Sequence, residues 1–277
     1  MRCLECNLKF VHPISLPILP AALFDSAYAG TLDESGLGDF AKRVEIRRKI
    51  IDDPSLWFWS PAFKNVIEWL RSNCGPRSVV LDVGCGMGFF MHALRREGFS
   101  PVGIDVAKLA VDLNTEDGFQ VFHGTVDTVP QGWVAPAAVV ALFMIHHVEN
   151  PRNFFDRIRK MWPDAYVAVA AYGPRNVDPR RTLPPRTLTL WDRKSLSVGL
   201  SIAGYHVVTK EFTSPRAEGV TLRLVQRVSD RINFTAEGYR LLKRIERKFV
   251  QRLLLPFGRE DGVVVAFGTP HKVPTQA

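Results

Sequence analysis

The stretch Val79–Phe90, which reads VVLDVGCGMGFF, decides the fold of this chain. An apolar run carries the acid Asp82, and the next turn places three glycines at alternate positions before a helical pattern begins. Glycines let the backbone turn tightly and approach a ligand closely, because no Cβ intervenes. A dinucleotide-binding turn would have its third glycine where Phe89 stands, and a phosphate-binding P-loop would need a Gly-Lys-Ser/Thr sequence that this stretch lacks.

A second acid stands at a related place in the next strand. Asp105 ends the run Val102–Asp105, 21 residues after Gly84. A carboxylate at such a position can accept hydrogen bonds from two hydroxyl groups of a ribose. The glycine turn and this spaced acid together are a more specific signal than a glycine motif alone.

The sequence around the turn alternates short apolar runs with helical patterns. The expected strands lie at 78–83, 101–104, 119–122, 138–144, 165–171, 205–210 and 262–267, and the expected helices at 89–97, 152–161 and 193–203. Strands that are continuously apolar and alternate with helices predict an α/β fold with a parallel sheet covered on both faces.

Two further helices are expected before the glycine turn, at 39–53 and 61–71. In the first of them Val44 and Ile51 fall on one side, and Arg47 interrupts this apolar stripe. The stripe still predicts an amphipathic helix.

On these residues the chain resembles the class I S-adenosylmethionine (SAM)-dependent methyltransferases, over about 77–172 and more weakly to the end. The resemblance implies a Rossmann-like seven-stranded sheet with strand order 3-2-1-4-5-7-6, SAM as cofactor and methyl transfer as activity. It also implies a cofactor site, in which the glycine turn holds the methionine part, Asp105 the ribose hydroxyls and Asp82 the amino group. The expected cofactor residues are Asp82, Gly84, Cys85, Gly86, Gly88, Asp105, Val106, Thr125, Val126 and Met144.

The segment that begins at His123 resembles the family's loop beside the adenine. Thr125 stands where the family often has an acid, so the backbone of Val126 or the side chain of Asp127 is expected to take over that contact.

The expected fourth strand runs into Phe143–Pro151, which resembles the family stretch Glu-His-Val-x-x-Pro. His147 falls on the family's histidine, and His146 replaces the more usual glutamate. A histidine at the carboxyl end of a parallel strand can take a proton from a hydroxyl or amine nucleophile. Two alternatives stay open: a histidine there can serve only as a structural hydrogen-bonding group, and methyl transfer can proceed by positioning alone.

The N-terminus holds one Cys-x-x-Cys pair, Cys3 and Cys6. Together with the residues that follow, it resembles the second knuckle of a zinc-ribbon-like prefix found before some methyltransferase domains. A tetrahedral zinc site needs four ligands. We therefore expect no metal from these residues alone; an upstream knuckle, or His12 with a partner chain, would have to complete a site.

Composition narrows the functional classes. Of 277 residues, 46% are hydrophobic and 23% charged, which is typical of a globular protein. The longest apolar runs, at 136–145 and 165–172, are too short to span a membrane, and four cysteines and no signal-like start favour a cytoplasmic protein without disulfides. The motifs of nucleic-acid base methylation, Asp/Asn-Pro-Pro-Tyr/Phe and Pro-Cys, are absent at the fourth strand, which disfavours nucleic acid as partner.

The net charge is +8, and the excess of basic residues includes the segments 175–193 and 239–255. In the second, basic side chains cover one face of an expected amphipathic helix. Such a helix can contact an anionic membrane, bind an acidic substrate or be an ordinary solvated face. An acidic small-molecule acceptor is slightly favoured. The oligomeric state is not predicted.

We expect four parts: an N-terminal segment (1–60) with the partial knuckle and a lid helix, the SAM-binding core (61–215), a basic helical insertion (216–257), and the final strand with a tail (258–277). Tyr28 and Trp57–Trp59 are candidates for the lid, with packing against the core as the alternative. The predicted function is methyl transfer to an oxygen or nitrogen of a small molecule. The alternatives are an RNA or protein methyltransferase and a non-catalytic scaffold that kept the fold.

Overall fold

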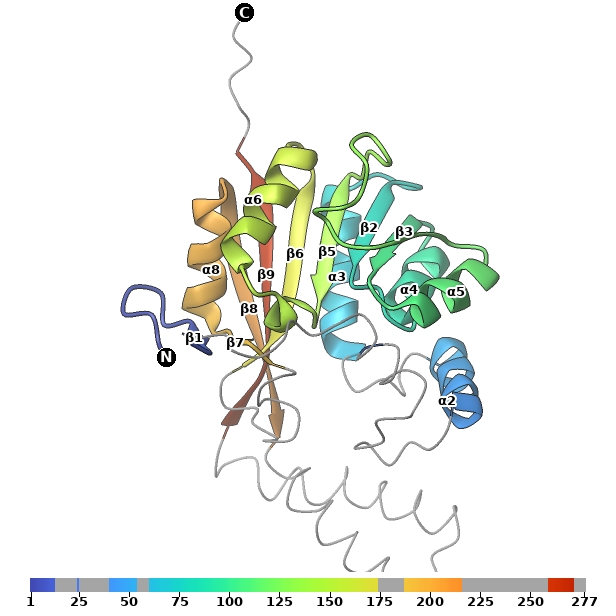
Figure 1. Ribbon diagram of the computed structural model, residues 1–277, viewed down its shortest axis with the longest axis horizontal. Helices are drawn as coiled ribbons and strands as arrows, with labels where there is room; N and C mark the ends of the chain where they lie inside the picture. The colour runs from blue at the N-terminus through green and yellow to red at the C-terminus, as the bar shows by residue number, and fades with distance from the viewer. Residues whose placement is uncertain (13–23, 25–39, 54–59, 174–186, 216–258, 272–277) are drawn as a thin grey trace, which may run out of the picture.

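The computed structural model describes residues 1–12, 24, 40–53, 60–173, 187–215 and 259–271. A seven-stranded sheet forms the centre, in the order β4-β3-β2-β5-β6-β9-β8 (Figure 1). Its strands are β2 (Val79–Val83), β3 (Ser100–Asp105), β4 (Gln120–His123), β5 (Ala138–Leu142), β6 (Tyr166–Tyr172), β8 (Tyr205–Pro215) and β9 (Arg259–Pro270). Counted along the chain, this is the expected order 3-2-1-4-5-7-6.

The first five strands of the sheet are parallel, whereas β9 runs antiparallel to both β6 and β8. The helices are α2 (Phe40–Asp52), α3 (Ser60–Asn73), α4 (Phe89–Arg96), α5 (Lys108–Glu116), α6 (Pro151–Met161) and α8 (Arg193–Ile202), with a short 3-10 helix, η2 (Ile145–His147). The α/β fold class and the Rossmann-like seven-stranded sheet are therefore confirmed.

Helices cover both faces of the sheet, and β5 shows how one strand serves both. Val139 and Ala141 pack into the core beneath α6 and α8, while Ala138, Val140 and Leu142 pack into the core beneath α3 and α4. Successive side chains of a strand point to opposite faces, so a strand buried on both sides must be apolar throughout. This explains why the strands are unbroken apolar runs in the sequence.

Most of the expected elements lie within a few residues of their predicted ends, but two features were not expected. Helix α5, between β3 and β4, was missed; its N-cap, Ala107, offers no side-chain cap. A small second sheet was missed as well, in which β1 (Lys9–Phe10) pairs antiparallel with β7 (Thr189–Leu190). The expected basic insertion, 216–257, and the aromatic residues Tyr28 and Trp57–Trp59 lie outside the described residues.

Among the helices that the structure describes, none has both the length and the apolar character that crossing a bilayer requires.

The core buries the hydroxyl group of a tyrosine. Tyr205, at the start of β8, is 1% exposed, and its hydroxyl makes no hydrogen bond to any residue that the structure describes. Burial raises the pKa of this phenol to about 12. A buried hydroxyl without a partner has lost its hydrogen bonds to water, which costs about 1–3 kcal/mol.

We therefore expect Tyr205→Phe to raise the free energy of unfolding by about 1 kcal/mol, because it removes the unsatisfied hydroxyl and keeps the ring. Chemical denaturation measures this change. Tyr166→Phe is the control, since the partly exposed Tyr166 stands on the same sheet and should change stability by less than about 0.5 kcal/mol. A Tyr205→Phe protein less stable than wild type would contradict the prediction.

Candidate functional site

The glycine turn between β2 and α4 has a backbone that only glycine adopts without strain. Gly84, Gly86 and Gly88 have φ values of 72°, 50° and 75°. A Cβ placed on Gly84 would lie 2.8 Å from the Cβ of Met144, which follows β5. The turn therefore needs glycine both for its left-handed backbone and for the close approach of the neighbouring strand's end.

Hydrogen bonds from β3 hold this turn in place. The amides of Gly84 and Cys85 both donate to the carbonyl of Ile104, at 2.8 and 3.2 Å. The amide of Gly86 donates to the Asp105 carboxylate at 2.7 Å, and the amide of Ala107 donates to its other oxygen at 2.9 Å. Asp105, expected from sequence to contact the cofactor, thus lies directly against the turn, because β2 and β3 are parallel neighbours.

Asp82 is a buried acid on β2 close to Asp105. Burial, and then the negative charge of Asp105, raise the pKa of the Asp82 carboxyl to about 8. Within the part of the chain that the structure describes, no cation pairs with Asp82. A buried carboxyl without a cation suits a ligand that brings one, such as the ammonium group of an amino acid. The turn and both acids fit the methionine part and ribose of SAM.

The carboxyl end of β5 is bent sharply. Phe143 has a φ of 61°, which is rare for a residue with a side chain and is typical of functional sites. The chain then forms η2, which carries His146 and His147. Their rings lie 4.1 Å apart, centroid to centroid, and His146 also lies 5.0 Å from the ring of Tyr172 on β6.

The two histidines differ in burial. His146 is 4% exposed, and its Nδ1 has no hydrogen-bond partner among the residues described. Burial, with a smaller effect of His147, holds the pKa of His146 well below its usual range, so this ring stays neutral. His147 is half-buried, and the ring of Phe24 packs edge-on against it at 5.3 Å. A residue of the N-terminal segment thus contacts the half-buried histidine.

The remaining expected cofactor residues lie around the same edge of the sheet. Val106 follows β3, and its carbonyl accepts a hydrogen bond from His123 at 3.0 Å. Thr125 is exposed and its hydroxyl accepts from the amide of Asp127. The Val126 side chain is buried in the main core and its carbonyl accepts from Arg157, so this side chain does not face a ligand.

Cys85 also points inward. Its thiol lies in a small core with Met91 and Phe119, close enough that a Cβ on Gly103 would come within 2.8 Å of its sulfur. Burial and the nearby acids raise the pKa of this thiol well above its usual range. Cys85 can therefore contact a cofactor only through its backbone.

Cys3 and Cys6 lie in a turn closed by the hydrogen bond from the amide of Cys3 to the carbonyl of Leu8, at 2.8 Å. Hydrogen bonds from backbone groups of Cys6 and Glu5 lower the pKa of the Cys3 thiol. Among the described residues no group of three metal-ligating side chains comes together, so these two cysteines have no further ligand there.

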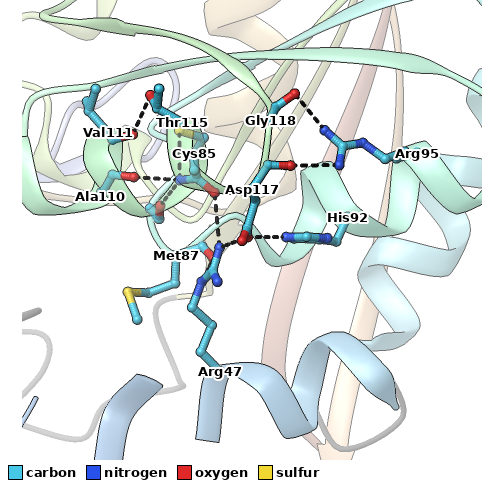
Figure 2. A network of polar contacts seen from close by, with 12 residues as sticks. Arg47, Cys85, Met87, His92, Arg95, Ala110, Val111, Thr115, Asp117 and Gly118 are labelled. Atoms are coloured by element: carbon cyan, nitrogen blue, oxygen red, sulfur yellow. Dashed lines mark hydrogen bonds and ion pairs between the residues drawn. The ribbon is translucent and has the colours of Figure 1, made fainter. Parts of the chain in front are cut away.

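Sequence reasoning missed a polar network beneath the glycine turn (Figure 2). Arg47 of α2 reaches the carbonyl of Met87 and the carboxylate of Asp117, and Asn114 of α5 reaches the carbonyl of Gly86. One signal was present in the sequence: Arg47 interrupts the apolar stripe of its helix, and the structure shows that this residue is buried.

The fold agrees with comparisons to known proteins. The profile of the methyltransferase domain family matches residues 58–209, which is just over half of the chain. The chain belongs to this methyltransferase domain family.

Individual relatives match only part of their length. The chain is 34% identical over 80 residues to EEF1A lysine methyltransferase 2 of Danio rerio, a match that covers 28% of this chain and 34% of that protein. It is 26% identical over 131 residues to the mitochondrial ubiquinone biosynthesis O-methyltransferase of Schizosaccharomyces pombe, covering 43% of this chain and 44% of the relative. The matches therefore span between a third and a half of these two proteins.

Among solved structures, a chain from the complex between the Haloferax volcanii Trm112 methyltransferase activator and a methyltransferase is similar in fold. The two share 19% identity with a TM-score of 0.57, and the match covers 90% of this chain and 98% of that chain. At this identity the likeness concerns the fold alone.

The raised pKa of Asp82 makes stability depend on pH. Between the ordinary value of 3.8 and the folded value of about 8, the folded protein keeps a proton that the unfolded chain has lost. Raising the pH through this window therefore lowers the free energy of unfolding, by up to about 1.4 kcal/mol per pH unit.

We expect the wild-type protein without cofactor to lose more stability between pH 5 and pH 8 than Asp82→Asn, which has no carboxyl to ionise. Denaturant unfolding of both proteins at the two pH values measures this difference. Asp112→Asn, an exposed acid on α5, serves as control and should follow the wild type. Equal pH dependence in the wild type and Asp82→Asn would refute the raised pKa.

Proposed function

We propose that this protein transfers a methyl group from SAM to an oxygen or nitrogen nucleophile of a small molecule. The observation that carries the proposal is the meeting of the glycine turn with the histidine-bearing end of β5. Gly84 and Met144 approach so closely that a Cβ on the glycine would clash, and the histidines begin two residues after Met144.

In this proposal the cofactor lies along the glycine turn. Gly84, Gly86 and Gly88 would allow its methionine part to approach the backbone, Asp82 would face its ammonium group, and Asp105 would accept the ribose hydroxyls. Val106, Thr125, the backbone of Val126 and Met144 would line the remaining edges. SAM supplies a methyl group that is bound to a sulfonium. The sulfur leaves as a neutral thioether, so the transfer needs no acid to protonate the leaving group.

We assign removal of the acceptor's proton to His147. A general base must reach the acceptor and then carry the proton. His147 is half-buried, whereas His146 is enclosed and its low pKa disfavours a charged ring. His146 would instead act as a neutral neighbour that packs against the His147 ring.

Two kinds of acceptor have support among the relatives. Ubiquinone biosynthesis O-methyltransferases, from Schizosaccharomyces pombe and from Azoarcus, favour a small hydroxylated acceptor. The lysine methyltransferase relative favours a protein amine as the second candidate. The net charge of +8 favours an acidic acceptor in either case. Within this proposal the core covers 61–215, and 1–60 supplies a lid, which the contact between Phe24 and His147 supports.

The cofactor site is tested by titrating the protein with S-adenosylhomocysteine (SAH), the product left after methyl transfer. Asp105→Asn should weaken SAH binding by about 5- to 150-fold, because the amides of Gly86 and Ala107 beside the turn lose a charged acceptor. Calorimetry measures the dissociation constants. Asp112→Asn, which changes an exposed acid of α5, should bind like the wild type, and an unaffected Asp105→Asn would remove Asp105 from the site.

The base is tested with radiolabelled SAM and an acceptor panel that contains phenols, aliphatic hydroxy acids, amines and a lysine-rich protein. His147→Gln should lower kcat by about 10²- to 10⁴-fold, because it removes the proton acceptor, while the SAH dissociation constant stays unchanged. An unchanged kcat would mean that positioning alone drives the transfer. Labelling of the protein substrate alone would favour the second candidate, and tight SAH binding without any labelled product would favour a scaffold.

A further inference from the structure

Helix α2 buries a charged side chain against the cofactor turn. Arg47 is 4% exposed, although the next two residues of the helix, Arg48 and Lys49, are exposed. A buried guanidinium destabilises a protein unless charges and hydrogen bonds compensate for its lost hydration. The hydrogen bonds and the ion pair that compensate for this lost hydration connect Arg47 to other elements of the core.

The guanidinium of Arg47 joins α2 to two parts of the core, the glycine turn and helix α5. Its Nε donates to the carbonyl of Met87, inside the glycine turn, at 2.8 Å. Its Nη2 forms an ion pair with Asp117, at the end of α5, and lies 3.4 Å from the side-chain oxygen of Asn114. Figure 2 shows Arg47 rising from α2 between Met87 and Asp117.

Asn114, which lies beside the Arg47 guanidinium, binds the neighbouring carbonyl of the turn, that of Gly86. It is fully buried, and its amide nitrogen donates to the carbonyls of Gly86, at 2.8 Å, and Ala110, at 2.7 Å. Its side-chain oxygen occupies the space beside Gly88, where a Cβ would come within 1.9 Å. The third glycine of the motif thus makes room for Asn114 as well as for the turn.

We propose that Arg47 is a positioning residue for the cofactor turn and that, through it, docking of α2 and binding of SAM stabilise each other. This rests on the proposed function, in which the turn holds the cofactor. Arg47 and Asn114 hold the carbonyls of Met87 and Gly86, while the carboxylate of Asp105 holds the amide of Gly86. Because linkage is reciprocal, whatever α2 adds to cofactor affinity the cofactor adds to docking of α2.

The molecule offers a matched control for a purely structural role. Arg95 of α4 binds the same end of α5, through the carbonyls of Asp117 and Gly118, and stacks on the ring of Phe119. Among the contacts of the described residues, Arg95 has no hydrogen bond to the glycine turn. Replacing Arg95 therefore weakens the attachment of α5 without touching the carbonyls of Met87 and Gly86.

The experiment compares Arg47→Gln, Arg47→Lys and Arg95→Gln by SAH titration and by hydrogen exchange. Arg47→Gln should weaken SAH binding about tenfold and speed amide exchange in the glycine turn, within the coupling range of about 5- to 150-fold. Arg47→Lys keeps the charge but cannot donate to two acceptors at once as a guanidinium does, so it should restore affinity only in part. Arg95→Gln should bind SAH within about twofold of the wild type.

Exchange in α2 provides the reciprocal readout. SAH should slow amide exchange across α2 in the wild type and not in Arg47→Gln. Wild-type affinity in Arg47→Gln, or equal losses in Arg47→Gln and Arg95→Gln, would overturn the coupling while leaving the cofactor site intact. A wild-type protein that does not bind SAH at all would overturn the proposed cofactor site together with the coupling.

Discussion

The rest of the structure depends on a short left-handed turn that cannot hold its own shape. Three glycines in five residues give the backbone access to positive φ angles, but they also leave the unfolded turn with many conformations. Its amides are held by Ile104 and Asp105 from β3. Its carbonyls are held by side chains from elsewhere in the chain, so the turn exists only when several distant segments have come together.

The parts of this arrangement that have local signals were predicted from sequence. Continuous apolar runs predicted the strands of the sheet, because a strand covered on both faces has no polar side. The spacing between the glycine turn and Asp105 predicted that both belong to one site. Parallel neighbours in register bring the ends of β2 and β3 to one edge of the sheet. The strand order followed from the family resemblance and not from these patterns.

What sequence could not provide depends on burial and on contacts between distant segments. The two adjacent histidines look equivalent in the sequence, yet His146 is enclosed and His147 is half-exposed. Nothing local distinguishes Asn114 from an ordinary surface asparagine, although it is fully buried beneath the turn. Helix α5 lacks both a capping side chain and a strong apolar stripe, so its existence depends on packing against β3 and β4. The only sign of Arg47 in the sequence is that it interrupts the apolar stripe of its helix.

The small sheet of β1 and β7 connects the N-terminal strand to the backbone of His146. Strand β1 pairs with β7, and the amide of Leu188, next to β7, donates to the carbonyl of His146 at 2.8 Å. The hydroxyl of Thr189 also approaches the carbonyl of Ile145 at 3.4 Å. Residues 9–10 therefore support the backbone that carries both histidines. A deletion of residues 9–10 removes that support.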